Sequence, residues 1–193
     1  FRTVLPEHAR AVAEPHGVTG TVVVEASPWV EDNQWILDLA ENEPFVVGFV
    51  GNLDPRSEDF EQNLDRFSAN PLFRGIRLGL RRGTDRDLES LMPQIEMLVR
   101  RDLQLDMMTN AEYLARNAAI PERFPELRIV IDHIAHVSVT GSAPDPKWID
   151  GIAAIAQYPN VYCKVSALAE NAAVQPAPTD PAHYVPTLDV LWN

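Results

Sequence analysis

The chain has 193 residues, of which 46% are hydrophobic, and a formal net charge of -12. This hydrophobic content excludes a largely disordered polypeptide, and the acidic balance disfavours nucleic acid and anionic membrane surfaces as partners because like charges repel. The single cysteine, Cys163, excludes an internal disulfide framework, and no apolar run is long enough to cross a bilayer. We therefore expect a cytoplasmic protein.

Helical and strand-like stretches alternate along the chain. In chain order the apolar spacing predicts a helix over 6–16, a strand over 20–27, a helix over 33–41, a strand over 45–50, a helix over 57–69, a strand over 75–80, a helix over 85–100, a strand over 103–108, a helix over 111–119, a strand over 127–133, a helix over 147–157, a strand over 160–167 and a helix over 181–192. The strands are apolar on both faces, which is typical of buried parallel strands.

Some helices carry more specific expectations. Four side chains are predicted to form the buried face of the helix after the first strand: Trp35, Ile36, Leu39 and Ala40. Pro93 is expected to kink the long helix over 85–100, because proline lacks the backbone donor that a helix interior uses. Pro121 is expected to stop the helix that follows strand 103–108.

Strands that alternate with helices predict an α/β fold of right-handed βαβ units around a parallel sheet. Two architectures fit, a (β/α)8 TIM barrel and an open doubly wound sheet. No phosphate-binding glycine motif follows any strand, which disfavours a nucleotide-binding open sheet. We predict that residues 1–193 form one (β/α) barrel domain that contains strands two to seven and lacks the first and last strands. The alternative is a complete open sheet of six strands.

The strand over 127–133 ends in the pair Asp132-His133. In parallel barrels the chemistry lies at the carboxyl ends of the strands. Because side chains alternate along a strand, we expect His133 to point into the barrel mouth and Asp132 to point toward the helices as a structural residue. His133 would then bind a divalent metal or polarise a carbonyl. The alternative is a core histidine that bonds to the backbone.

Two other polar residues, Arg77 and His136, are candidates. Arg77 lies inside a predicted strand and needs an anion, which would be a substrate carboxylate, Glu25 or Asp106. His136 follows His133 in the predicted loop and is a candidate binding residue.

The strand over 160–167 carries Lys164 and Ser166 toward the same rim. A buried lysine must form an ion pair or shift its pKa, and we expect an ion pair with Glu25 or Asp106 rather than Schiff-base chemistry. Cys163 has the opposite parity to Lys164, so we expect it to face the helices and to be unreactive.

Several segments carry a resemblance to a known family: Gly20 to Ser27 with Asn33-Gln34-Trp35, then Phe73-Arg74-Gly75-Ile76-Arg77, then Ile129 to Ala135, and Asn160 to Ser166. In this order they resemble the amidohydrolase-related family of TIM-barrel hydrolases. The nearest branch holds the pyrone-dicarboxylate and sugar lactonases. The resemblance runs over essentially the whole chain.

The resemblance implies a barrel that hydrolyses or decarboxylates small carboxylated compounds. It also implies a His-x-His pair on the first strand, a histidine on the sixth and an aspartate on the eighth. His133 matches the sixth-strand histidine, Arg77 matches the fourth-strand arginine, and Lys164 and Ser166 match the seventh-strand motif. The chain contains no His-x-His sequence, and His136 stands where relatives often carry lysine or glycine.

From this resemblance we predict a hydrolase that acts on a small carboxylated lactone, ester or amide. His133 is the predicted catalytic residue and a candidate ligand of one divalent metal, zinc or manganese. Arg77, Ser166 and His136 are the predicted substrate-binding residues. An aspartate outside this chain would be the general base, so we expect the isolated chain to be inactive. The alternatives are a decarboxylase of the same superfamily, or a non-catalytic module whose open strand edges pair with a partner or with a second copy.

Overall fold

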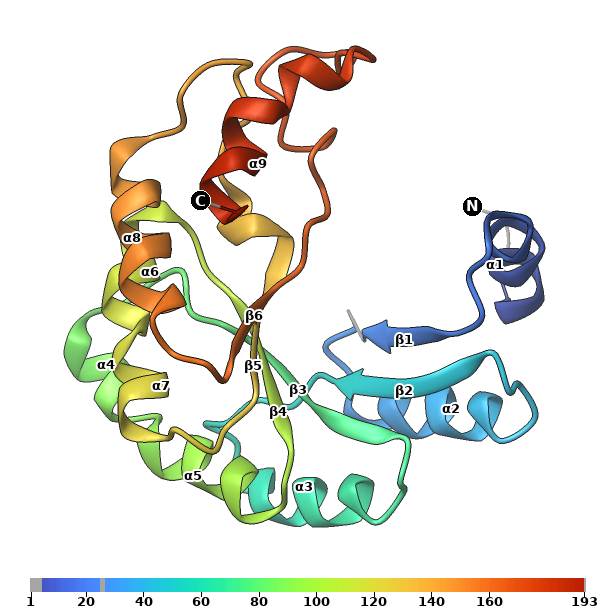
Figure 1. Ribbon diagram of the computed structural model, residues 1–193. Coiled ribbons are helices and arrows are strands. Elements are labelled where there is room, and N and C mark those ends of the chain that lie inside the picture. The colour runs from blue at the N-terminus through green and yellow to red at the C-terminus, as the bar shows by residue number, and fades with distance from the viewer. Residues whose placement is uncertain (1–4, 25–26, 193) are drawn as a thin grey trace. The chain divides into compact units, whose positions relative to one another are not determined.

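Parallel strands and helices alternate in the computed structural model, which describes residues 5–24 and 27–192 (Figure 1). The chain divides into two compact units, residues 1–77 and 78–193, called here the N-terminal unit and the C-terminal unit. The predicted α/β class and the predicted alternation of strands with helical segments are confirmed, but the segments predicted as single helices over 85–100 and 111–119 each correspond to two shorter helices. The prediction of a single barrel domain that lacks its first and last strands stays a prediction. No helix of the described residues is long and apolar enough to span a membrane.

The elements of the N-terminal unit are α1 (Pro6–Ala13), η1 (Glu14–His16), β1 (Thr21–Val24), α2 (Val30–Ala40), β2 (Val46–Gly51), α3 (Phe60–Ser68) and β3 (Phe73–Gly79), the last of which runs into the other unit. The strands of the N-terminal unit run in parallel, and α2 and α3 pack on one side of them (Figure 1). β2 pairs in parallel with both β1 and β3. Phe60, Leu64 and Phe67 of α3 are buried, as apolar residues spaced three or four apart on one helix face should be.

The buried face of α2 differs from the prediction. Ala40 is buried as predicted, but Trp35 is 53% exposed, and Asn33 and Leu37 are the other buried residues of the helix. Asn33 donates from Nδ2 to the carbonyl of Val30 at 2.8 Å and accepts at Oδ1 from the amide of Asn52 at 2.9 Å. A polar side chain can be buried at little cost when its hydrogen bonds are made. Hydrophobicity alone could not reveal that an asparagine would take the inward position.

The C-terminal unit contains a second set of parallel strands. Its elements are α4 (Asp85–Glu89), α5 (Met92–Arg100), β4 (Gln104–Met108), α6 (Ala111–Asn117), α7 (Ala119–Arg123), β5 (Ile129–Ile131), η2 (Asp132–His136), α8 (Pro146–Ala156), β6 (Val161–Cys163), η3 (Pro181–His183) and α9 (Val185–Trp192). β5 pairs in parallel with β4 and β6, so that Met107, Ile131 and Cys163 lie side by side in adjacent strands. The carboxyl ends of these three strands therefore meet.

Both predictions about proline were wrong. Pro93 does not kink a long helix, because α4 ends at Glu89 and α5 begins at Met92, which places Pro93 in the first turn of α5. Pro121 lies inside the five-residue helix α7 instead of stopping a helix. The first backbone N–H groups of a helix have no partner within it, so proline is tolerated at both positions.

Candidate active site

The chain leaves β5 in a left-handed turn. His133, Ile134, Ala135 and His136 have φ angles of 53°, 48°, 53° and 49°. Each L-residue in this conformation costs roughly 1–2 kcal/mol, and a β-branched residue such as Ile134 is rarely found there. The strand was predicted to run to residue 133 but ends at Ile131. The alternation that assigned directions to Asp132 and His133 therefore does not apply.

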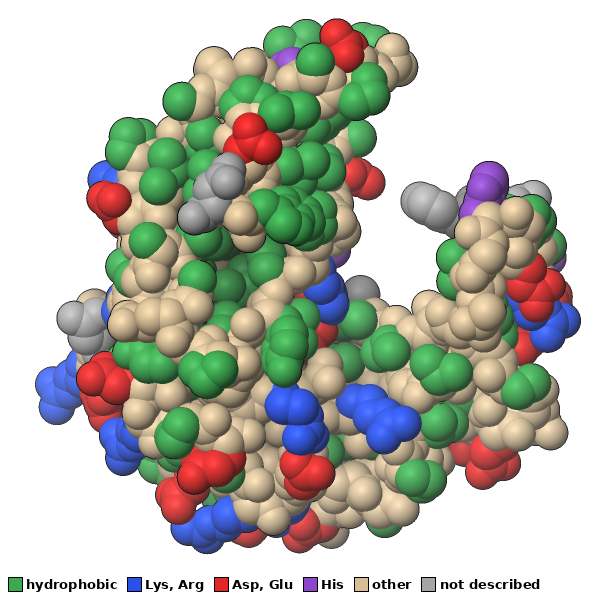
Figure 2. Space-filling view, viewed as in Figure 1, with side chains coloured by type: hydrophobic (Ala, Val, Ile, Leu, Met, Phe, Trp, Pro, Cys, Tyr) green, Lys and Arg blue, Asp and Glu red, His purple; other side chains and the backbone are tan. Residues whose placement is uncertain are grey.

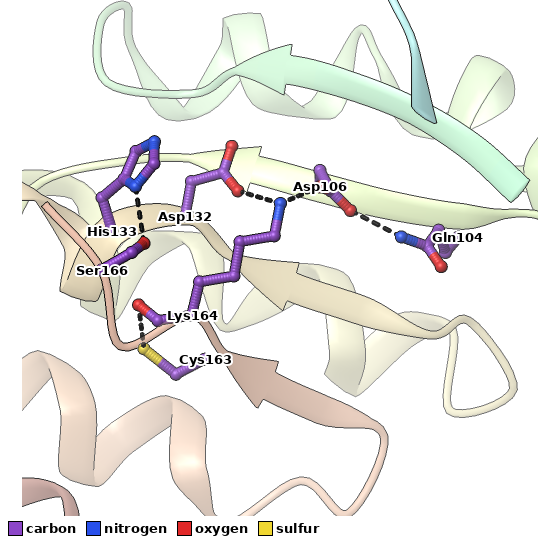
Figure 3. A network of polar contacts seen from close by, with 7 residues as sticks. All are labelled: Gln104, Asp106, Asp132, His133, Cys163, Lys164 and Ser166. Carbon is purple, nitrogen blue, oxygen red and sulfur yellow. Dashed lines mark hydrogen bonds and ion pairs between the residues drawn. The ribbon is translucent and has the colours of Figure 1, made fainter. Parts of the chain in front are cut away.

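Asp132 meets a lysine. It is 1% exposed, and its Oδ1 accepts a hydrogen bond from Lys164 Nζ at 2.7 Å (Figure 3). Lys164 also donates to Oδ2 of Asp106, which is 0% exposed. The other oxygen of Asp106, Oδ1, accepts from Gln104 Nε2 at 2.7 Å. The predicted ion pair of Lys164 with Asp106 is thus confirmed, whereas its other predicted partner, Glu25, lies outside the described residues.

The group of Asp106, Asp132 and Lys164, called here the Lys164 cluster, combines one ammonium with two buried carboxylates. Burial raises the pKa of Asp106, although the hydrogen bond from Lys164 opposes this rise. Burial lowers the pKa of Lys164, but the hydrogen bonds to both carboxylates outweigh it, so that the pKa lies above its usual value. Asp132 Oδ2 has no hydrogen-bond partner within the described residues. The Lys164 cluster therefore keeps the ammonium of Lys164 charged, and Oδ2 of Asp132 can still accept a hydrogen bond.

The pairing of Asp132 with Asp106 across Lys164 was missed from the sequence. The available signal was the presence of three ionisable side chains in or next to apolar strands, since buried charges must be paired. That signal identifies charges in need of a partner, but it does not tell which strands are neighbours.

His133 and Ser166 form a second contact beside the Lys164 cluster. His133 Nδ1 lies 2.8 Å from Ser166 Oγ (Figure 3). The ring centroid of His136 lies 5.3 Å from that of His133. The structure therefore brings together three of the predicted site residues, His133, Ser166 and His136. Arg77 lies on β3 in the N-terminal unit, and its role as a carboxylate-binding residue stays a prediction.

The hydrogen bond to Ser166 determines what the other nitrogen of His133 can do. If the hydroxyl of Ser166 donates to Nδ1, a neutral imidazole carries its proton on Nε2, which is then a hydrogen-bond donor. If Nδ1 donates to Ser166 Oγ, Nε2 carries a lone pair and can bind a metal. The same contact thus supports both chemistries considered for this histidine.

His136 lies beside His133, with the two rings in a tilted arrangement. Burial lowers the pKa of His136, and the charges of His133 and Arg81 lower it further. Its Nε2 atom is buried and has no hydrogen-bond partner among the residues that the structure describes. A neutral imidazole in this place can accept or donate one hydrogen bond to a ligand.

The side chains of the described residues supply too few ligands for a divalent metal. Within the described residues, no group of three or more histidine, cysteine, aspartate or glutamate side chains could hold a metal ion. A catalytic zinc usually has three protein ligands. The described residues therefore do not form a metal site by themselves, and the assignment of His133 as a ligand stays a prediction.

Cys163 lies on the helix side of β6, away from the Lys164 cluster. It lines an open hollow of about 800 Å³ with Ile149 and Ile152 of α8 and Val190 of α9. Hydrophobic side chains gather around this hollow beside α8 and α9 (Figure 2). Burial raises the pKa of the thiol to about 11. The predicted direction of Cys163 toward the helices is confirmed.

We expect Cys163 to react slowly with iodoacetamide at pH 8. At pH 8 a pKa near 11 leaves about two hundredfold less thiolate than the ordinary cysteine value of about 8.5, so the native chain should be alkylated at least about tenfold more slowly than the chain in urea. Mass spectrometry of timed samples measures both rates. Equal rates would contradict the burial of the thiol.

Comparison with known proteins places the chain in a family. The family model described as amidohydrolase matches residues 1–192. The chain belongs to the amidohydrolase family. The resemblance predicted from the strand motifs is thereby confirmed.

The chain matches only part of the length of a related protein. An L-fucono-1,5-lactonase of Burkholderia ambifaria is 34% identical over 179 residues, which cover 91% of this chain and 61% of the lactonase. This chain therefore spans about 61% of the length of that relative.

Two solved structures share the fold. An amidohydrolase of Burkholderia multivorans with bound zinc matches with a TM-score of 0.83 and 20% identity, over 98% of this chain and 68% of that one. A probable 2-pyrone-4,6-dicarboxylic acid hydrolase of Acinetobacter baumannii with bound citric acid matches with a TM-score of 0.74 and 16% identity, over 97% and 67%. At these identities the matches show the fold, and they confirm the predicted α/β barrel type.

Proposed function

We propose that the full-length protein hydrolyses the ring ester of a small lactone that carries a carboxylate. The observation that carries the proposal is the pair of His133 and Ser166 beside the Lys164 cluster, at the carboxyl ends of adjacent parallel strands. The family and the lactonase that is 34% identical support this reaction class.

In lactone hydrolysis a water molecule adds to the ring carbonyl, and the ring C–O bond then breaks to give a hydroxy acid. Negative charge develops on the carbonyl oxygen during the addition, and a hydrogen-bond donor aimed at that oxygen lowers the barrier. We assign this role to Nε2–H of His133, with Ser166 holding the tautomer through Nδ1. An aspartate outside residues 1–193 would take the proton from the water.

The other roles in the proposal follow from charge and position. Arg77 would bind the substrate carboxylate, because a guanidinium pairs with a carboxylate through two parallel hydrogen bonds. His136 would contact the substrate as a neutral imidazole, consistent with its lowered pKa. If a zinc or manganese ion is used, it would polarise the carbonyl, with His133 as one ligand and the others from outside the described residues. The zinc-bound amidohydrolase supports metal use in the family.

We further propose a cytoplasmic location, on the ground of the single cysteine.

We expect the full-length protein to release acid from 2-pyrone-4,6-dicarboxylate, a lactone that carries carboxylates, well above the spontaneous rate, and L-fucono-1,5-lactone, which has no free carboxylate, is the comparison substrate. The assay follows acid release with a pH indicator, with and without a chelator, and uses residues 1–193 alone as the control that should be inactive. A folded full-length protein that opens neither lactone would contradict the proposal. Release of carbon dioxide without ring opening would favour decarboxylation instead.

A further inference from the structure

The peptide group of Ile134 is the centre of the left-handed turn. Ile134 is 0% exposed, so both its amide and its carbonyl lie away from solvent. Its amide donates to the carbonyl of Lys164 at 3.0 Å. Its carbonyl accepts from Nε1 of Trp148 at 2.8 Å. These two contacts come from Lys164, which directly follows β6, and from Trp148 of α8.

Trp148 is itself held in place by its helix. It is 0% exposed and lies in the first turn of α8, where the side chain of Asp145 caps the helix by accepting from the amide of Lys147 at 2.9 Å. One turn later, Gly151 packs so closely on α6 that a Cβ atom there would lie 2.9 Å from Leu114 Cβ. The position of the indole is therefore set by the packing of α8, not by the turn that it contacts.

We propose that Trp148 is a positioning residue for His133. Its indole N–H binds the Ile134 carbonyl and thereby keeps residues 133–136 in the left-handed turn that brings His133 Nδ1 to Ser166 Oγ. The inference deepens the proposed function, and its kinetic arm rests on that function.

The physical reason lies in the instability of the turn on its own. Four successive residues with positive φ are unfavourable for L-amino acids, so the turn persists only where other contacts hold it. The remaining backbone contact of the Ile134 carbonyl, from the amide of Val137, is long at 3.4 Å. Without the indole donor the buried carbonyl would lose its good hydrogen bond, and the turn would relax toward ordinary φ angles. His133, one residue earlier, would then lose its aim at Ser166.

The test removes the N–H and keeps the shape of the side chain. In the full-length enzyme, Trp148 is replaced by β-(3-benzothienyl)alanine, in which sulfur takes the place of the N–H, and separately by phenylalanine (Trp148→Phe). We expect kcat for the lactone to fall at least tenfold with KM within twofold. In protein labelled with ¹⁵N-histidine, we expect the ring nitrogen signals of His133, assigned by their loss in His133→Asn, to shift.

Two controls separate positioning from general destabilisation. Ile152→Val removes a buried methylene from the same helix and should lower the melting temperature while leaving kcat and the His133 signals unchanged. The benzothienyl replacement at the exposed Trp35 should change neither kcat nor the His133 signals. A folded benzothienyl variant at residue 148 with wild-type His133 signals and wild-type kcat would overturn the inference. The nuclear magnetic resonance arm needs no turnover, so it decides the inference even if the enzyme opens no lactone and the proposed function fails.

Discussion

Replacing Lys164 with methionine (Lys164→Met) should lower the free energy of unfolding by about 3–5 kcal/mol, the range measured when one partner of a buried ion pair is removed. The substitution leaves Asp106 and Asp132 facing each other without their shared cation, although their side chains are only 0% and 1% exposed. Because the side chain of Lys164 is 32% exposed, we expect a value near the lower end. Urea unfolding of the purified chain measures it.

Lys147→Met is the matched control, since Lys147 is an exposed lysine of the same unit and should change stability by no more than about 0.5 kcal/mol. The pair Asp106→Asn with Lys164→Met should recover part of the loss, because it removes one of the two unpaired charges. A Lys164→Met chain as stable as the control would show that the cluster contributes no net stability.

Comparing Lys164→Met with wild type also shows how the stability contributed by the Lys164 cluster depends on pH. The pKa of Lys164 is raised in the folded chain, so its contribution is complete below the ordinary lysine value of about 10.4 and is lost as the pH rises through the higher folded value. The difference in stability between wild type and Lys164→Met should therefore stay large at pH 8 to 9 and shrink at more alkaline pH. A difference that grew with alkaline pH would contradict the direction of this shift.

Replacing His133 with asparagine (His133→Asn) in the full-length enzyme should lower kcat for the lactone by about 10²–10³, the usual cost of removing one donor to a developing oxyanion. The asparagine amide cannot reach the place of Nε2, so the donor is lost. Asparagine tolerates positive φ better than most residues, so the turn at φ 53° should survive and the melting temperature should change little. Steady-state kinetics separates kcat from KM.

Ser166→Ala should lower kcat less than His133→Asn does. It removes the hydrogen bond that fixes the tautomer of His133 but leaves the imidazole ring in the site. The exposed His16 provides the control His16→Asn, which should be fully active. If His133→Asn kept the wild-type kcat, His133 would have no catalytic role. A fall in kcat that came with a large fall in the melting temperature would instead indicate that the histidine only supports the turn.

How much of this could be predicted from the sequence depends on the range of the interactions involved. The order of strands and helices, the buried stripe of α3 and the α/β class follow from hydrophobic spacing, which acts over a few residues. The ordered motifs around Arg77, His133 and Lys164 also predicted the family correctly. The histidine and serine in these motifs, His133 and Ser166, lie in contact. Local sequence patterns were sufficient for these features.

The tertiary structure decided the geometry of the strand end that holds His133. Hydrophobicity predicted that this strand runs to residue 133, but it ends at Ile131 and turns left-handed. The turn depends on the indole of Trp148 and the carbonyl of Lys164, groups 14 and 30 residues away from Ile134 that only the packing of α8 and β6 brings near. Asp132 turned inward for the same reason, since its partner is Lys164 and not a neighbour in its own strand. The sequence by itself determined which elements form and which family they belong to, whereas contacts between distant segments decided where the side chains of the site point.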